Sequence, residues 1–313
     1  MDNSLAFVFP GQGSQSLGML ADLAAAHPAV RAAFDEASTG CGVDLWSLAS
    51  QGPEEQLNQT EFTQPALLAA DVAAWRAWQA AGGAQPARFA GHSLGEYAAL
   101  VAAGALSLAD AARLVRERGR LMQAAVPAGT GAMAAVLGTE DALVAEVCSA
   151  VSGEEVVVPA NYNSPGQVVI GGHAAAVDRA IAELNARGVR KTVKLAVSVP
   201  SHTPLMRAAA DRLADAIAAV SWQMPDRPVV QNADAAVADT VVGIADALVR
   251  QLYLPVRWSE CVQALAAAGS TRIVECGPGK VLAGLVKRID KSLDARSIGP
   301  AADFDAALAE MRA

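Results

Sequence analysis

Short apolar runs and longer amphipathic segments follow one another along this chain. Strands are predicted for the apolar runs at 6–9 and 88–90, and helical periodicity covers 18–37, 63–81, 94–105 and 107–122. Ser107, with Asp110 three residues on, is typical of a helix N-terminus. Strands that alternate with helices indicate a mainly parallel sheet with helices on both faces.

The pattern changes between 128 and 197. Strands are expected at 132–137, 155–159, 167–171 and 192–197, and helices at 140–151 and 173–187. A βαββαβ order within about seventy residues is typical of the ferredoxin-like motif. We therefore predict that 128–197 forms a small ferredoxin-like subdomain.

The larger α/β pattern resumes after this segment. Helices are expected at 203–220 and 303–311, and strands at 229–231 and 271–275. The predicted fold is α/β and hydrolase-like, with a mainly parallel sheet flanked by helices. Its large catalytic domain comprises 1–127 and 198–313, and the small subdomain is inserted between these two parts.

A Gly-x-Ser-x-Gly sequence at 91–95 lies between a predicted strand and a predicted helix. This context is typical of a serine on a sharp strand-to-helix turn, with glycines where side chains would not fit. The helix start adds free N–H groups that can stabilise an oxyanion. The pentapeptide also occurs by chance, but its setting favours Ser93 as a nucleophile.

Composition limits the classes of function. Of 313 residues, 53% are hydrophobic and 18% charged, which indicates a globular protein, and a net charge of −8 argues against nucleic acid as a partner. We expect no signal peptide, because the first residues lack a basic segment, and no membrane segment, because Gly or charged residues break the apolar runs. We expect no metal and no disulfide, because the four cysteines are widely separated. A reducing cytoplasm is the expected location.

Four histidines could serve a nucleophilic serine as a base. His202 follows a predicted strand and precedes a helix, where catalytic residues often lie, although a satisfied loop histidine is an equal alternative. Asp226 and Asp234 are the nearest acids downstream, but neither has a persuasive setting. A neutral acceptor, such as a backbone carbonyl, could orient the imidazole instead.

Arg118 is the arginine of the 107–122 helix that lies nearest its apolar face. A half-buried arginine binds a carboxylate or phosphate through two parallel hydrogen bonds. The alternative is a structural salt bridge with a buried Asp or Glu. The glycine-rich segments 11–16 and 277–280 lack the spacing of nucleotide-binding loops, so we expect no nucleotide cofactor.

Several motifs together resemble one family, the malonyl-CoA:acyl carrier protein transacylases of bacterial type II fatty acid synthesis. The resemblance covers nearly the whole chain. The matching segments are 7–15 (FVFPGQGSQ), 91–97 (GHSLGEY), 116–119 (RERG), 161–167 (NYNSPGQ), 199–202 (VPSH) and 275–280 (ECGPGK).

The resemblance implies a set of catalytic roles. Ser93 is the nucleophile, and His202 is its general base and acid. The backbone N–H groups of Gln12 and Leu94 form the oxyanion hole, and the backbone carbonyl of Gln251 orients His202.

The resemblance also implies substrates and partners. Arg118 binds the malonyl carboxylate, and Asn163 lines the pocket. His92 adjoins Ser93 on the turn, so we expect it to be structural or part of the pocket wall. Malonyl-CoA and acyl carrier protein are the substrates, no further cofactor is needed, and the enzyme is a monomer. Two alternatives remain at this point: a hydrolase with the same serine and histidine, and an idle module that binds acyl carrier protein. The inward arginine favours transfer.

Overall fold

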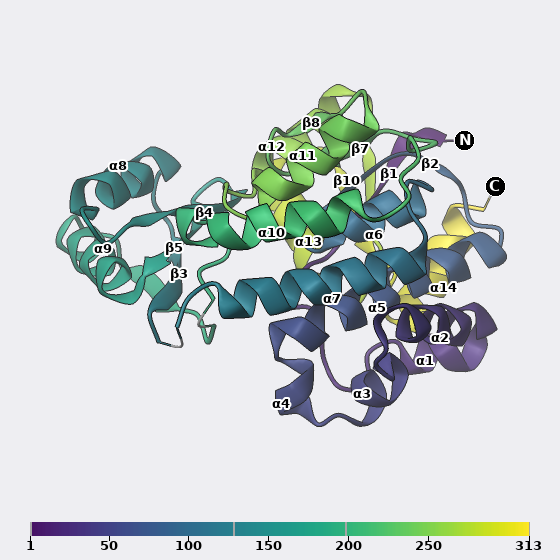
Figure 1. Cartoon of the computed structure of the whole chain (residues 1–313). Helices are drawn as coiled ribbons and strands as arrows, with labels where there is room; N and C mark the ends of the chain where they lie inside the picture. The colour runs from purple at the N-terminus through teal and green to yellow at the C-terminus, as the bar shows by residue number, and fades with distance from the viewer. Residues whose placement is uncertain (1, 128, 198, 313) are drawn as a thin grey trace.

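The computed structural model describes residues 2–127, 129–197 and 199–312, which form two β-sheets (Figure 1). The larger sheet has the strand order β10-β9-β1-β2-β7-β8 and is parallel except for β8. Its strands are β1 (Asp2–Phe9), β2 (Pro86–Gly91), β7 (Val229–Gln231), β8 (Ala236–Val237), β9 (Arg272–Glu275) and β10 (Asp294–Ser297). The predicted mainly parallel sheet is confirmed.

Helices cover both faces of this sheet, because successive residues of a strand point to opposite sides. Phe7 and Phe9 pack into the larger core, and Ala6 and Val8 into a second core. The larger core receives α1 (Ala21–Ala26), α2 (Pro28–Cys41), α3 (Leu45–Gln51), α4 (Glu54–Leu57), α5 (Thr60–Ala80), α6 (Gly95–Ala102), α7 (Leu108–Ala124), η1 (Pro204–Met206), α10 (Arg207–Ala218), α11 (Val241–Gln251) and α14 (Ala301–Glu310). The second core receives α12 (Trp258–Ala267) and α13 (Val281–Ile289).

The smaller sheet confirms the predicted βαββαβ order. It is antiparallel with strand order β4-β5-β3-β6, and α8 and α9 cover one face at the end of the molecule far from both termini (Figure 1). Its elements are β3 (Gly131–Leu137), α8 (Asp141–Val151), β4 (Val157–Ser164), β5 (Gln167–His173), α9 (Ala174–Ala186) and β6 (Lys191–Lys194). The boundaries expected at 128 and 198 fall outside the described residues, and the division into domains stays a prediction.

Some predicted elements were wrong in extent. The helix expected at 18–37 is two helices, α1 and α2, because Pro28 begins a new helix and cannot continue the old one. The helix expected at 203–220 starts as the short η1 turn. The strand expected at 155–159 continues to Ser164, since β4 pairs with β5 along most of its length.

Parallel pairing brings the carboxyl ends of the central strands to one edge of the larger sheet. Phe9 lies opposite Gly91, and Val8 opposite Glu275. The loops that follow β1, β2, β7 and β9 therefore meet there, which is where open α/β sheets place their sites.

Candidate active site

Ser93 lies on a strained turn between β2 and α6. Its φ is +52°, a left-handed conformation that is unfavourable for a residue with a side chain. A Cβ at Gly95 would lie 2.0 Å from the carbonyl oxygen of Phe9, and a Cβ at Gly91 would lie 1.9 Å from the carbonyl carbon of Gly95. The turn thus packs directly against β1, and only glycine fits on either side of the serine.

Ser93 and His202 are within hydrogen-bonding distance. The Ser93 Oγ lies 2.8 Å from Nε2 of His202, and the other ring nitrogen, Nδ1, lies 2.7 Å from the backbone oxygen of Gln251. A carbonyl oxygen only accepts, so Nδ1 carries the proton and Nε2 is free to accept the serine hydroxyl. Burial, followed by nearby Arg118, lowers the pKa of His202 to about 3. The imidazole is therefore neutral and able to act as a base.

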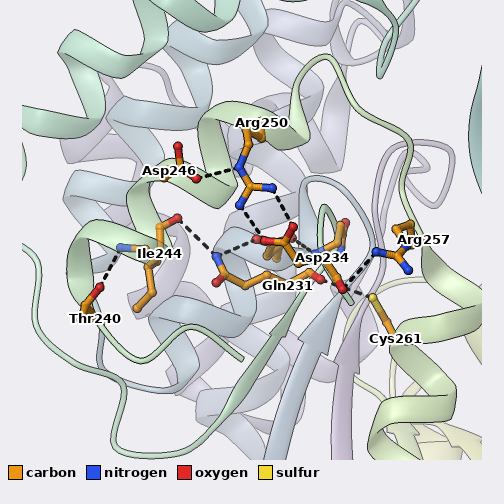
Figure 2. Close-up of polar contacts among 11 residues, drawn as sticks. Gln231, Asp234, Thr240, Ile244, Asp246, Arg250, Arg257 and Cys261 are labelled. Atoms are coloured by element: carbon orange, nitrogen blue, oxygen red, sulfur yellow. Dashed lines mark hydrogen bonds and ion pairs between the residues drawn. The ribbon is translucent and has the colours of Figure 1, made fainter. Parts of the chain in front are cut away.

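Neither aspartate considered from the sequence orients this histidine. Asp234 instead accepts two hydrogen bonds from Arg250 (Figure 2). Among the described residues, the His202 ring has polar contacts with Ser93 and Gln251 alone, and Asp226 contributes none. The neutral acceptor considered from the sequence is present at the expected residue, Gln251.

Arg118 points inward from α7 and is 1% exposed. Its guanidinium donates to Oε1 of Gln64 at 2.7 Å, to Oε1 of Gln251 at 2.9 Å and to the Ser93 Oγ at 3.2 Å. All these partners are neutral, and across the described chain no carboxylate forms an ion pair with Arg118. The structural salt bridge considered from the sequence is therefore wrong. A buried cation beside the serine, without an anionic partner, attracts an anionic ligand.

Two residues that hold the serine turn were missed by the sequence reasoning. The side-chain oxygen of Asn232 accepts from the backbone N–H of Ser93 at 2.7 Å, and its NH₂ group donates to the Gly91 carbonyl at 2.7 Å. Glu96, 0% exposed, accepts from the backbone N–H of Asn232 at 2.8 Å. The signal for Asn232 was its position directly after the predicted strand at 229–231.

The remaining predicted residues surround the serine turn. Nε2 of His92 lies 2.8 Å from Oδ1 of Asn163, so this contact joins the turn to β4 of the smaller sheet. Leu94 is the N-cap of α6, and the loop that carries Gln12 approaches the turn, since a Cβ at Gly11 would lie 2.4 Å from the His92 oxygen. Their roles in binding and in the oxyanion hole stay predictions.

Two kinds of feature are absent from the part of the chain that the structure describes. Within residues 2–127, 129–197 and 199–312, no group of three or more His, Cys, Asp or Glu side chains is arranged to hold a metal ion. In the same part of the chain, no helix has the length and apolar character needed to cross a membrane.

Comparison with known proteins adds independent findings. The profile of a family described as "Acyl transferase domain" matches residues 6–303. The malonyl CoA-acyl carrier protein transacylase of Escherichia coli K12 is 54% identical over 303 residues, which are 97% of this chain and 98% of that relative. The Bacillus subtilis protein of the same description is 44% identical over 292 residues, 93% of this chain and 92% of the relative.

Solved structures of this kind of protein also match the chain closely. The malonyl-CoA:acyl carrier protein transacylase of Xanthomonas oryzae is 67% identical with a TM-score of 0.99, and the match covers 100% of this chain and 99% of that one. A malonyl-transacylase in complex with its type II PKS acyl-carrier protein is 51% identical with a TM-score of 0.96, covering 98% and 99%. This chain therefore belongs to the acyl transferase domain family and, within it, to the malonyl CoA-acyl carrier protein transacylases.

Proposed function

We propose that this protein transfers a malonyl group from malonyl-CoA to the phosphopantetheine thiol of acyl carrier protein, through a malonyl ester of Ser93. One observation carries the proposal: Arg118, buried and with only neutral partners among the described residues, lies 3.2 Å from the Ser93 Oγ. A thioester held at Ser93 then has its free carboxylate within reach of the guanidinium, which can bind it through two hydrogen bonds.

The reaction has two half-reactions that share the same residues. The Ser93 Oγ attacks the thioester carbon, its proton passes to Nε2 of His202, and the backbone N–H groups of Gln12 and Leu94 stabilise the oxyanion. The C–S bond then breaks, and His202 returns the proton to the CoA sulfur. In the second half-reaction His202 takes the proton of the carrier thiol, whose sulfur attacks the ester, and Ser93 leaves with that proton.

Gln251 takes the place of a triad acid. Its carbonyl oxygen, 2.7 Å from Nδ1, fixes the tautomer that leaves Nε2 free to accept a proton. A full negative charge there would raise the pKa of His202 and attract the cation of Arg118. A neutral acceptor avoids both effects.

Arg118 also predicts a preference for malonyl over acetyl groups. An acetyl group offers no carboxylate, so the buried guanidinium would keep only its neutral partners when acetyl is bound. His92 and Asn163, joined by their 2.8 Å contact, form the wall of the same pocket. The pocket then favours an acyl group that carries a negative charge.

Acyl carrier protein is the proposed partner, and basic residues are the proposed docking site. Carrier proteins are acidic, and Lys287 and Arg288 lie exposed in the last turn of α13. Arg288 donates to the Gln167 side chain at 2.7 Å, so this turn lies beside the smaller sheet. We place the enzyme in the cytoplasm as a monomer; its four cysteines, all buried free thiols, are consistent with a reducing compartment.

Intact-mass spectrometry tests the proposed function. Incubation with malonyl-CoA should add one malonyl group to the protein, and holo acyl carrier protein should then remove it. The Ser93→Ala variant is the control and should gain no adduct. Steady release of CoA without an adduct or a malonylated carrier would indicate a hydrolase and would refute the transfer.

A further inference from the structure

The Arg118 guanidinium is held by the oxygen ends of two carboxamides. Gln64 and Gln251 accept from it at 2.7 Å and 2.9 Å. A carboxamide has one accepting end and one donating end, so the contacts of each NH₂ group determine which end faces the arginine. The NH₂ of Gln64 donates to Thr60 Oγ1 at 2.9 Å, and the NH₂ of Gln251 donates to the Ser93 carbonyl at 2.9 Å.

The same NH₂ group of Gln251 also donates to Oε2 of Glu96, at 3.0 Å. Glu96 is fully buried and accepts two further hydrogen bonds, from the backbone N–H of Asn232 at 2.8 Å and from the Gln231 side chain at 3.4 Å. All three partners are N–H donors, which is the environment of an ionised carboxylate. The chain of contacts therefore runs from Arg118 through the Gln251 carboxamide to Glu96.

Arg118 and Glu96 interact electrostatically although they do not touch. Burial is the largest influence on both groups: it lowers the pKa of Arg118 and raises the pKa of Glu96 to about 7. The attraction between the two charges opposes both shifts. The charge of Glu96 thus reduces the free-energy penalty of burying the Arg118 cation. Because the two side chains do not touch, Glu96 occupies none of the guanidinium N–H groups.

We infer that the Gln251 carboxamide is a spacer that prevents a direct ion pair between Arg118 and Glu96 and thereby keeps the guanidinium available for the substrate carboxylate. The inference rests on the proposed function of Arg118. A carboxylate in direct contact would neutralise the cation and would have to be displaced by each malonyl group. A neutral carboxamide orients the cation without competing for it. Gln251 is in this account a positioning residue that determines specificity, and Glu96 is the carboxylate that it keeps apart from Arg118.

An exchange of two side chains tests the spacer. The double variant Gln251→Glu/Glu96→Gln keeps the net charge and almost the same volume, but it moves the carboxylate into contact with Arg118. The matched control, Gln231→Glu/Glu96→Gln, moves the same charge to a side chain that also contacts Glu96 but has no polar contact with Arg118. For each protein, kcat/KM of Ser93 loading is measured with malonyl-CoA and with acetyl-CoA.

The ratio of these two kcat/KM values is the decisive quantity. We expect the ratio to fall about tenfold or more in the Gln251 exchange, mainly through a higher KM for malonyl-CoA, and to stay within about twofold of wild type in the Gln231 exchange. A merely structural role would lower both loading rates together and leave the ratio unchanged. An unchanged ratio in a Gln251 exchange that unfolds like the wild type would overturn the spacer.

A second set of variants covers the case in which the exchange does not fold. Gln251→Ala removes the carboxamide and the atoms between Arg118 and Glu96, so the two charges can meet and the ratio should fall. Adding Glu96→Gln removes the competing carboxylate and should restore part of the ratio. A double variant no more selective than Gln251→Ala would refute the inference. A wild-type enzyme without malonyl preference, or an Arg118→Ala variant that keeps it, would instead refute the proposed function.

Discussion

Two arginines next to Gln251, its sequence neighbour Arg250 and its side-chain contact Arg118, differ in the charge of their hydrogen-bond acceptors. Arg250 is a partly exposed residue in the last turn of α11, and we call it and its two acidic partners the rim. It donates to both carboxylate oxygens of Asp234 at 2.7 Å and 2.6 Å and to Asp246 at 2.6 Å (Figure 2). Arg118, in the interior, donates three hydrogen bonds within the described chain, and all three acceptors are neutral side chains. The side chain of Arg250 is 26% exposed, whereas Arg118 is 1% exposed.

The difference separates a structural cation from a binding cation. At the rim, water and salt screen the charges, so an ion pair adds about 1 kcal/mol or less and mainly fixes the end of α11. In the interior, an unpaired charge is expensive, and a protein retains it where a ligand completes the pairing. Five predictions test this contrast.

The largest effect is expected for Arg118→Ala. Removing the guanidinium takes away the partner of the malonyl carboxylate, so kcat/KM for malonyl loading should fall by a factor of about 100 or more. Acetyl loading should fall far less, and the preference for malonyl should disappear. Loading rates with both thioesters provide the measurement, and an unchanged malonyl preference would contradict the role of Arg118.

The second effect concerns how the rate of malonyl loading depends on pH. Because the pKa of His202 is lowered to about 3, the imidazole stays neutral in mild acid, and its protonation should cause no fall in single-turnover malonyl loading at saturating substrate between about pH 8 and about pH 5. A fall in rate centred on pH 6.5, the ordinary histidine value, would show that the base is not buried as described.

The same shift predicts how stability depends on pH. The unfolded chain binds a proton at His202 near pH 6.5, whereas the folded chain does so only near pH 3. The resulting contribution to the free energy of unfolding is therefore complete above pH 6.5 and is lost as the pH falls toward 3. Denaturant unfolding of wild type and His202→Gln should differ in slope across this range, and parallel curves would contradict the shift.

A smaller effect is expected at the rim for Arg250→Ala. Its matched control is Arg187→Ala, because Arg187 also pairs with two carboxylates, those of Glu146 and Glu183, and is 34% exposed. Arg250→Ala should lower the free energy of unfolding by about 1 kcal/mol, and Arg187→Ala should lower it only slightly. Only Arg250→Ala should also slow malonyl loading a few-fold, because the next residue carries the carbonyl that orients His202. Equal loading rates in the two variants would disprove this link.

The smallest effect is the salt dependence of the ion pair between Arg250 and Asp234. A double-mutant cycle of Arg250→Ala and Asp234→Ala should give a coupling free energy of about 1 kcal/mol at low salt that decreases in 1 M NaCl, with a Debye length of about 3 Å. The malonyl-to-acetyl preference should change much less with salt, because Arg118 is buried. A preference that falls in parallel with the coupling free energy would mean that the interior is screened like the rim.

Local patterns were sufficient to predict much of the site. The glycines around Ser93 indicated the turn, the apolar stripe of α7 indicated that Arg118 faces inward, and resemblance identified Gln251 as the acceptor of His202. The first two features depend on neighbours in sequence or on one helix face, whereas the role of Gln251 came from the resemblance alone. The βαββαβ order of the smaller sheet followed from periodicity in the same way.

The polar network behind the serine could not be predicted in this way. Glu96 and Asn232 lie 136 positions apart in sequence and meet only because β2 and β7 pair in parallel. The absence of a carboxylate beside Arg118, within the part of the chain that the structure describes, is likewise a property of tertiary packing. The break at Pro28 was visible in the sequence, but helical periodicity on both sides obscured it.

Competition between the two thioesters tests the central claim most directly. Wild type and Arg118→Ala are incubated separately, each with equal concentrations of malonyl-CoA and acetyl-CoA. The adduct on the Ser93 peptide of each protein is then identified by its mass. The account predicts a malonyl adduct on the wild type and a largely acetyl adduct on Arg118→Ala. A malonyl adduct that predominates on both proteins would contradict selection of the substrate by a buried, unpaired arginine.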